Sequence, residues 1–499
     1  MTIIKRQTIY GTIFSYGGVL VGVFTQAFLY AKYLDIEVVG LFAMLFNWNM
    51  ILGFIMNLGF NNAGTKYFHK FRDTKKKHKG YLFNGLGFLV IGSVLVALIL
   101  YFFKGKILNS SANDSELFRE YYYLILPLSF VTALFYVFEN YAKGLYDTIM
   151  STFLQQFLQK LLVLVVAVLF IIGVLDLNQL MHFWVLALAI PAALLIWYSS
   201  RLEGFSLSPS SFLRKSSFKK EFVTFAGFSI VTGLGSVILS RLDSLLVYEY
   251  LGLKQIGIYN FCLLFGGVMS ISYNVTMKAS TAIVLDAFAS SDFDKVKTIF
   301  KKSSITQVVF GTGLLLLVWI NIDSFFSFIK PEYTAGKYVI LIIGLAKLFD
   351  LSSGINSLIF SYSKYYKLDS LIIISFIGIL LLMNHLLIPK YGLNGAAVAA
   401  FVATIYYNLT RNFFIWKYYK MHPYQWKSLL ILLVGISLGV LAEFLPNFRE
   451  NNLWTLLSVT YKTILIGGGF IMLILLFKIS PDLNKLVEDL KYQLINKGS

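Results

Sequence analysis

Basic side chains inside long apolar stretches are the residues of this sequence best placed to do chemistry. A cation at the centre of a bilayer costs roughly 2.5–3.5 kcal/mol on insertion scales, so each one needs a compensating environment. A water-filled cavity that holds such cations suits an anionic ligand, because arginine offers a planar fork to phosphate oxygens and lysine a point charge. The basic residues in question are Lys160, Arg241, Lys278, Lys347, Arg411 and Lys462.

The sequence context of these cations differs from one to the next. Arg241 lies deep in its apolar stretch, Lys160 follows a run of glutamines, and Arg411 lies between two asparagines. Lys278 is near the end of its stretch, so it either lines a cavity or extends to the lipid headgroups. We expect Lys462 to extend to the headgroups. We predict that the ligand is bound by Arg241, Lys347, Arg411, Lys160 and Lys278.

Two acidic residues, Asp243 and Asp350, lie deep in apolar stretches and are our candidates for ion coupling. A buried acid beside basic groups changes its interactions when it gains or loses a proton, as a coupling site requires. Lys347 precedes Asp350 by three residues and shares its helix face. This pair is compatible with a structural ion pair, a ligand contact or a coupling site.

Neutral polar residues add groups suited to sugars, since hydroxyl-rich ligands need donors and acceptors and aromatic faces pack on sugar rings. The alternative is plain hydrogen bonding between helices, worth about 0.6 kcal/mol per contact. The candidate sugar contacts are Asn47, Trp48, Asn57 and Asn274.

The elements that must position these residues are apolar helices. About fourteen apolar stretches, each near the roughly 20 residues needed to cross a bilayer, fill the chain. Hydrophobic residues make up 57% and charged residues 14% of the 499 residues. The connecting stretches are too short for a further soluble domain. The sequence therefore predicts an all-α polytopic membrane protein.

Metal and nucleic-acid chemistry find no support in the sequence. Cys262 is the only cysteine, and the five histidines show no metal-ligand spacing, so we expect no metal and no cofactor. The net charge of +18 reflects short cytoplasmic loops rich in lysine and arginine rather than nucleic-acid binding.

The basic residues collect in alternate loops, which predicts an even number of spans and two cytoplasmic termini. Residues 75–79 form the most basic of these loops, and residues 110–115 fall on the opposite side. Apolar residues at helical spacing in the tail, after Ser480-Pro481-Asp482, predict an amphipathic helix on the cytoplasmic face. The alternative is a frayed tail.

Two segments repeat one pattern. Residues 33–42 (YLDIEVVGLF) and 250–259 (YLGLKQIGIY) align at an offset of 217 residues. A weaker echo aligns Asp176-Leu177-Asn178 with Gly392-Leu393-Asn394 at an offset of 216. A repeat of about six spans in one orientation gives parallel halves related by an axis along the membrane normal, as in known transporters.

Further motifs follow these hairpins in a characteristic order. They are residues 58–60 (LGF), 63–67 (AGTKY), 241–243 (RLD) and 389–397 (PKYGLNGAA). In this order they resemble the oligosaccharide-lipid flippases of bacteria, within the multidrug, oligosaccharidyl-lipid and polysaccharide exporter superfamily. The resemblance covers essentially the whole chain and implies two six-helix bundles around a central cavity that opens alternately to each side, with two accessory helices outside them.

The expected domains follow from the repeat and this resemblance. They are a first bundle over residues 1–200, a cytoplasmic linker over 201–220, a second bundle over 221–420, accessory helices over 421–479 and the tail helix over 480–499.

The resemblance also implies a cargo: an oligosaccharide linked to undecaprenyl pyrophosphate, moved to the outer leaflet of the inner membrane for surface polysaccharides such as O-antigen. Membrane lipids and the polysaccharide polymerase machinery are the partners it implies. The chain would then be a transporter of the cytoplasmic membrane and not an enzyme.

Three alternatives stay open from the residues alone. A multidrug or small-molecule cation antiporter of the same superfamily is disfavoured by the excess of basic residues in the spans. A flippase for lipid II would use the same chemistry on a related anionic lipid. A membrane-embedded polysaccharide polymerase is less compatible with the short outer loops and with histidines that lack an acidic partner at useful spacing.

Overall fold

The computed structural model describes residues 3–108, 115–209, 213, 218–447, 451–479 and 484, which form helices joined by short connections and contain no strand. The chain divides into two compact units, Met1–Asn260 and Phe261–Ser499. We call these the first and the second unit. The predicted tail helix, apart from residue 484, and most of the loop at residues 110–115 lie outside the described residues.

The division into units follows contacts, whereas the expected domains follow the repeat. Residues 221–260 pack with the first unit, although the repeat groups them with the second half. The domain bounds drawn from the sequence therefore stay a prediction.

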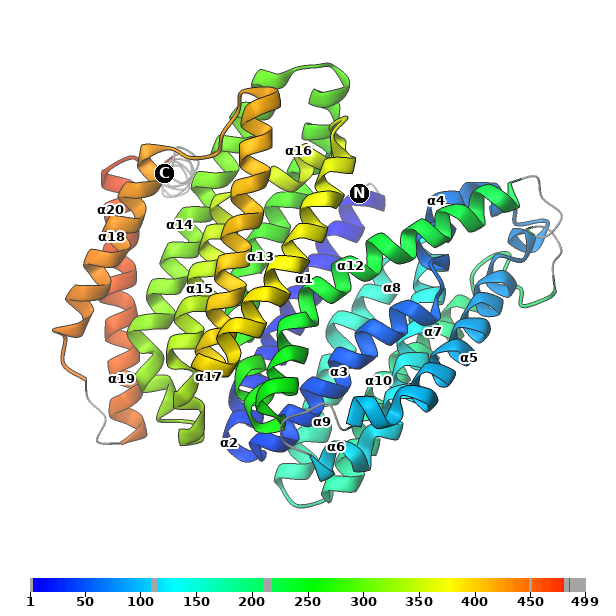
Figure 1. Cartoon of the computed structure of the whole chain (residues 1–499), viewed down its shortest axis with the longest axis horizontal. Helices are drawn as coiled ribbons and strands as arrows, with labels where there is room; N and C mark the ends of the chain where they lie inside the picture. Colours follow the sequence, from blue (N-terminus) through cyan, green and yellow to red (C-terminus); the bar gives the residue numbers. More distant parts are fainter. Residues whose placement is uncertain are drawn as a thin grey trace, which may run out of the picture. The chain divides into compact units, whose positions relative to one another are not determined.

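The first unit is a bundle of long helices with short helical pieces at their ends. α3 and α10 both pack along α7 (Figure 1). A seven-residue π-helical segment, Phe24–Tyr30, extends α1, and a six-residue one, Phe153–Leu158, precedes α9. The helices are α1 (Ile3–Val23), α2 (Ala31–Tyr33), α3 (Ile36–Met56), α4 (Phe60–Phe71), α5 (Tyr81–Leu108), α6 (Glu116–Tyr121), α7 (Ile125–Gly144), α8 (Ile149–Thr152), α9 (Gln159–Ile171), α10 (Leu177–Ser199) and α12 (Lys219–Leu251).

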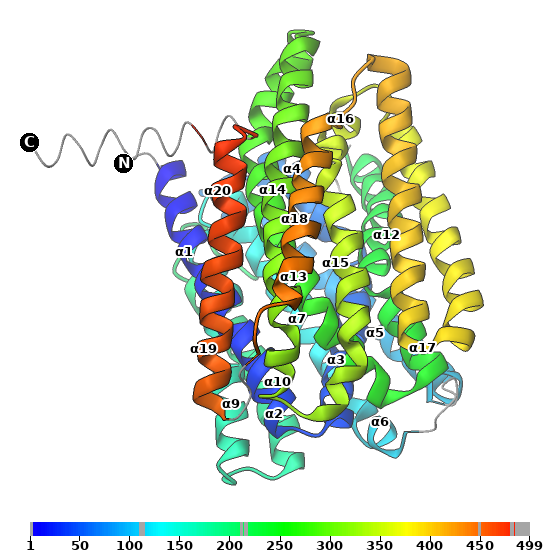
Figure 2. The same cartoon turned by 90° about the vertical axis from the view of Figure 1, so that its left-hand side faces the viewer.

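The second unit begins inside α13. Its helix α14 packs against α15 on one side and against α18 on another (Figure 2). The resemblance places the last helices outside the core bundle, and here they pack on α14. The helices are α13 (Leu253–Ala289), α14 (Phe293–Phe326), α15 (Lys337–Ser352), α16 (Asn356–Tyr362), α17 (Tyr366–Tyr419), α18 (Trp426–Glu443), α19 (Asn452–Lys462) and α20 (Gly468–Leu476).

The helices confirm an all-α, multi-pass membrane protein. Among the described residues, 11 helices are long and apolar enough to cross a membrane, or up to 13 when two bent pairs each count as one span. The bent pairs are Lys219–Gly235 with Ser240–Leu251, at 56°, and Pro331–Ser352 with Asn356–Tyr362, at 48°.

The 54-residue helix α17 explains why this number falls below the expected fourteen. Its backbone reverses at Gly392, where φ is 57° and ψ is −134°, so two arms lie side by side (Figure 2). Tyr406 donates to the Ser375 hydroxyl across the arms at 3.0 Å. The span count treats α17 as one helix, so fourteen crossings remain a prediction.

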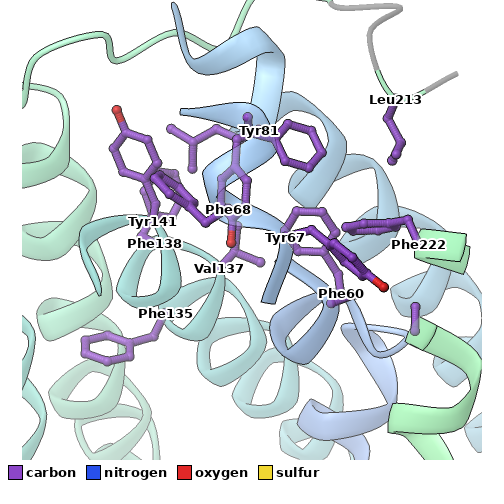
Figure 3. Packing of buried hydrophobic residues seen from close by; sticks show 14 of the residues in the cluster. Phe60, Tyr67, Phe68, Tyr81, Phe135, Val137, Phe138, Tyr141, Leu213 and Phe222 are labelled. Atoms are coloured by element: carbon purple, nitrogen blue, oxygen red, sulfur yellow. The ribbon is translucent and has the colours of Figure 1, made fainter. Parts of the chain in front are cut away.

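An aromatic cluster fixes the start of α12 to the rest of the first unit (Figure 3). The Phe222 ring of α12 lies 5.8 Å from that of Phe60 and 5.9 Å from that of Tyr67, both on α4. The Tyr67 hydroxyl also donates to the Glu221 carboxylate at 2.8 Å. Aromatic pairs at this spacing stabilise by about 0.5–1.5 kcal/mol beyond the burial of their area. The first half of α12 is therefore anchored to α4.

A break between α3 and α4 lets α12 approach this closely. Leu58 and Gly59 both adopt positive φ, 44° and 73°. A Cβ at Gly59 would lie 2.1 Å from the Ala226 carbonyl oxygen of α12. Glycine is therefore required there for both its backbone conformation and its small size.

Candidate functional site

Two cations of the first unit, Lys160 on α9 and Arg241 on α12, lie close enough for their like charges to act on each other. Both side chains are half-buried within apolar helices. Neither takes part in an ion pair among the described residues, where the ion pairs include Lys70–Glu221, Lys143–Glu139, Lys337–Asp323, Lys347–Asp350 and Arg411–Asp369. Asp243 attracts Arg241 electrostatically without forming an ion pair with it. Two like charges near each other inside apolar helices are favourable only with compensating negative charge or water.

The helix before Lys160 is irregular. The π-helical segment Phe153–Leu158 ends two residues before it, and such segments occur often at functional sites. Helix α1 crosses this segment at its glycines Gly18 and Gly22. A Cβ at Gly18 would lie only 1.6 Å from the Gln156 carbonyl oxygen, and one at Gly22 would lie 3.6 Å from Cδ of Lys160. Helix α1 thus packs directly against the alkyl chain of Lys160.

Arg241 follows the 56° bend of α12 by one residue. Its guanidinium lies 5.1 Å from the centre of the Phe46 ring of α3, a cation–π contact worth about 0.5–1 kcal/mol or more when desolvated. The Tyr136 hydroxyl of α7 lies close enough to Gln155 and Arg241 to interact electrostatically with both. Helices α3, α7, α9 and α12 therefore contribute to one cationic site, which we call the first-unit site.

Asp243 is not ion-paired with Arg241, although only two residues separate them. Residues two apart on a helix point to different faces. The Asp243 carboxylate accepts hydrogen bonds from the Tyr259 hydroxyl at 2.9 Å and from the Ser244 backbone N–H at 2.9 Å. The hydrogen-bond partners of Asp243 are thus neutral, whereas Asp350 forms an ion pair with Lys347.

The second unit holds a connected polar network at the bend between α15 and α16. The Lys347 ammonium donates to the Asp350 carboxylate at 3.2 Å. The Asn408 amide of α17 donates to the other oxygen of Asp350 at 3.1 Å, and Asn356 donates to the Asn408 oxygen at 2.9 Å. Asn356 is the first residue of α16 and follows directly after the bend. The network therefore ties the bend to α17.

This network extends to the end of the second arm of α17. The Asn412 amide donates to the Ser353 hydroxyl at 3.1 Å and to the Tyr424 hydroxyl at 2.8 Å. Gly354, between the two halves of the bend, has a φ of 52°. The Ser304 hydroxyl of α14 donates to the Ser352 carbonyl at 2.6 Å, so a carbonyl exposed by the break has a partner.

Arg411 is already engaged within the second unit. Its guanidinium donates to both carboxylate oxygens of Asp369, at 2.7 and 2.8 Å, and lies 4.1 Å from the centre of the Tyr407 ring. Asp369 lies on the first arm of α17 and Arg411 on the second, so this ion pair joins the two arms. For Arg411 to bind a ligand, Asp369 would have to release it.

The remaining predicted cations have other surroundings. Lys278 is exposed on α13, with no ion pair in the described parts of the chain. Lys462 is 3% exposed, and its ammonium donates to the Asn447 oxygen at 2.5 Å. Asn447 lies in the connection before α19, so the charge of Lys462 is directed toward a helix end.

The candidate sugar contacts are mostly inside the helix packing. Asn47 and Asn57 are 0% and 1% exposed. The Asn57 amide donates to the Gly53 carbonyl of α3 at 3.2 Å and to the Ala133 carbonyl of α7 at 3.3 Å, and the second bond joins the two helices. Trp48 is half-buried, whereas Asn274 is exposed on α13. The contact of Asn57 matches the helix–helix alternative, and a sugar role for these residues stays a prediction.

Sequence reasoning missed several members of both sites. Asp369 is 42 residues from its partner Arg411, and only the reversal of α17 brings the two together. Phe46 and Tyr136 carry no charge and look like ordinary apolar-helix residues. The glutamines before Lys160 were the one signal available, and Gln155 does belong to the first-unit site. In the described residues, no group of three or more histidine, cysteine or acidic side chains could hold a metal ion.

The fold is similar to that of known transporters. It matches a structure of the lipid II flippase MurJ in an inward closed conformation with a TM-score of 0.67 and 14% identity, over 94% of this chain and 100% of that chain. It also matches an inward-facing multidrug resistance MATE family transporter of the MOP superfamily, with a TM-score of 0.57 and 13% identity, over 88% of this chain and 95% of that chain. At these identities the likeness concerns the fold.

The family of the chain is identified from its sequence. No curated protein sequence matches the chain significantly. The family model described as polysaccharide biosynthesis protein matches residues 6–284, which is more than half of the 499 residues. The chain therefore belongs to the polysaccharide biosynthesis protein family.

Proposed function

We propose that this protein is a flippase that moves an undecaprenyl-pyrophosphate-linked oligosaccharide from the cytoplasmic to the outer leaflet of the bacterial inner membrane by alternating access. The observation that carries the proposal is the first-unit site, where Lys160 and Arg241 lie together without an ion pair. A pyrophosphate supplies the concentrated negative charge that two such cations lack.

The family and the fold agree with this cargo. A family described by polysaccharide biosynthesis points to sugar-bearing substrates. MurJ, whose fold the chain shares, is a flippase for lipid II, a lipid-linked substrate. A lipid-linked oligosaccharide combines both properties. The surface polysaccharide, such as O-antigen, and any contact with a polymerase are part of the proposal.

The exposed fractions of their side chains indicate which cations of the second unit could contact the cargo more easily. The Lys347 side chain is 38% exposed and makes one ion pair, whereas the Arg411 side chain is 8% exposed and pairs through two hydrogen bonds. Lys347 can therefore turn toward an anion at lower cost than Arg411. Lys278, exposed on α13, is free to meet the headgroup early.

Asp243 is our preferred coupling residue. Its carboxylate has neutral partners and no ion pair in the described residues, so protonation does not break a salt bridge. Protonation of Asp350 would weaken its contact with Lys347 and disturb the network at the bend of the second unit. Protonation of Asp243 is therefore reversible without the loss of an ion pair, whereas protonation of Asp350 would also disturb the packing at the bend.

A cation antiporter is the second candidate, because the chain also shares its fold with MATE transporters. In that case Asp243, as an acid with no ion pair in the described residues, would bind the substrate cation. The unpaired cations of the first-unit site oppose this, since they repel a cationic substrate.

Reconstitution into liposomes tests the two functions. Purified protein would be inserted together with a fluorescent undecaprenyl-pyrophosphate oligosaccharide, and the label would be quenched from outside. We expect protein-dependent exchange between leaflets that undecaprenyl pyrophosphate inhibits and that a cationic dye such as ethidium does not. Counterflow of ethidium without exchange of the lipid-linked sugar would establish the antiporter instead.

A further inference from the structure

The two repeated hairpins contact each other inside the first unit through equivalent residues. A Cβ at Gly40, on α3, would lie 2.0 Å from the Leu253 carbonyl oxygen of α13. A Cβ at Gly257, on α13, would lie 2.6 Å from the Ile36 carbonyl oxygen of α3. Because the sequence offset is 217 residues, Gly257 is the counterpart of Gly40 and Leu253 is the counterpart of Ile36. The contact is therefore reciprocal.

A reciprocal contact between equivalent residues is expected at a two-fold axis. In a two-fold interface, residue i meets residue j and j meets i on the other side. A chance contact between unrelated helix ends would not pair both glycines with the equivalent carbonyl. The contact thus supports the internal repeat independently of the sequence pattern, and it places the axis between Gly40 and Gly257.

The contact is close because each helix has a glycine at the crossing. All four residues are buried, with Ile36 2% and Leu253 4% exposed. Glycine allows helix backbones to approach in membranes, where packing rather than the hydrophobic effect holds helices together. The neighbour at each glycine is a backbone carbonyl, which cannot move aside as a flexible side chain can. Alanine at either position would push the helix ends apart.

We propose that this junction, Ile36–Gly40 with Leu253–Gly257, is the interface by which the two repeats hold one side of the transporter closed, and that it separates in each transport cycle. The transport part of this inference rests on the proposed function. Parallel repeats that rock about a shared axis must part at one end to admit cargo at the other. The topology drawn from the sequence puts the junction on the outer side.

Cross-linking tests the junction without any transport measurement. Glu37 and Lys254 are exposed and directly follow Ile36 and Leu253. In a Cys262→Ser background, a short cleavable bis-thiol reagent should link Glu37→Cys to Lys254→Cys. Adding Gly40→Ala should lower the yield several-fold, and Gly257→Ala should lower it less, because its clash is milder. Gly87→Ala, which meets nothing within 4 Å, should leave the yield unchanged. Equal yields in all three variants would overturn the junction.

Transport by the linked protein tests the separation. Linking Glu37→Cys to Lys254→Cys should lower exchange of the lipid-linked sugar at least tenfold, and cleavage of the reagent should restore it. A disulfide between Gly53→Cys and Thr132→Cys is the matched control. A Cβ at Gly53 lies 3.5 Å from Cβ of Thr132, within disulfide range, and this bond joins α3 to α7 within one repeat.

The outcomes separate this inference from the proposed function. Unchanged exchange by the linked hairpins, at full cross-linking, would refute separation while leaving the cargo intact. A complete lack of exchange by the unlinked parent would count against the cargo, and the cross-linking yields of the glycine variants would still decide whether the junction exists.

Discussion

At the scale of single residues, the cations of the two units differ in their partners. Lys160 and Arg241 form no ion pair in the described residues, whereas Lys347 and Arg411 are paired with Asp350 and Asp369. A cation with an internal carboxylate is already neutralised, so it contributes less to attracting an anion. The first-unit site is therefore the stronger candidate for binding the proposed pyrophosphate.

The Arg411–Asp369 pair should be a determinant of stability. Removing one partner of a buried ion pair typically costs about 3–5 kcal/mol, because the other charge is left buried alone. We expect Asp369→Asn and Arg411→Ala to lower the thermal unfolding temperature of the purified protein clearly, and Arg411→Met with Asp369→Leu to recover part of the loss. An Arg411→Ala protein that unfolds like the parent yet fails to move cargo would instead make Arg411 a cargo contact.

The two deep acids should respond differently to neutralisation. Asp243→Asn keeps the size of the side chain and removes its titration, so we expect transport to lose its dependence on an imposed ion gradient with normal stability. Asp350→Asn breaks the contact with Lys347 and should lower the unfolding temperature. Transport that depends on the gradient as in the parent in both variants would show that neither acid is the coupling site.

At the scale of elements, the reversal in α17 requires glycine. Gly392 has φ 57° and ψ −134°, a region that other residues rarely adopt. Strain of this kind costs about 1–3 kcal/mol. We expect Gly392→Ala to lower thermal stability by a corresponding amount. Gly378→Ala is the control on the same helix, because neither glycine has a neighbour within 4 Å of an added Cβ and Gly378 has no positive φ. Equal unfolding temperatures for the two variants would contradict this account of the turn.

The sequence predicted the elements better than their contacts. Apolar stretches of the right length identify membrane helices, and the repeated pattern at Gly40 and Gly257 identified two hairpins that do meet. Contacts between distant segments had no local signal, which is why Asp369 escaped notice as the partner of Arg411. The hydrogen bond of Asn57 to Ala133 on α7 was also not predictable, because a sequence does not show which face of a helix packs against its neighbour. Helix breaks, such as the one at Leu58, also leave no periodic trace.

At the scale of the whole molecule, the distribution of basic residues predicts sidedness. Residues 75–79 and the C-terminal tail should be cytoplasmic, and residues 110–115 should face outward. We expect Ser111→Cys in a Cys262→Ser background to react with an impermeant thiol reagent in cells whose inner membrane is intact, and Lys76→Cys to react only after permeabilisation. The reverse pattern would invert the topology and place the hairpin junction on the cytoplasmic side.

The central claim is that a cationic site inside the membrane selects an anionic lipid-linked sugar. Its most direct test is leaflet exchange of the fluorescent undecaprenyl-pyrophosphate oligosaccharide by Arg241→Ala and Lys462→Ala at matched protein levels. We predict at least a tenfold loss for Arg241→Ala, partial activity for Arg241→Lys because the planar fork is lost, and nearly parental activity for Lys462→Ala. Equal exchange by Arg241→Ala and Lys462→Ala would contradict the claim.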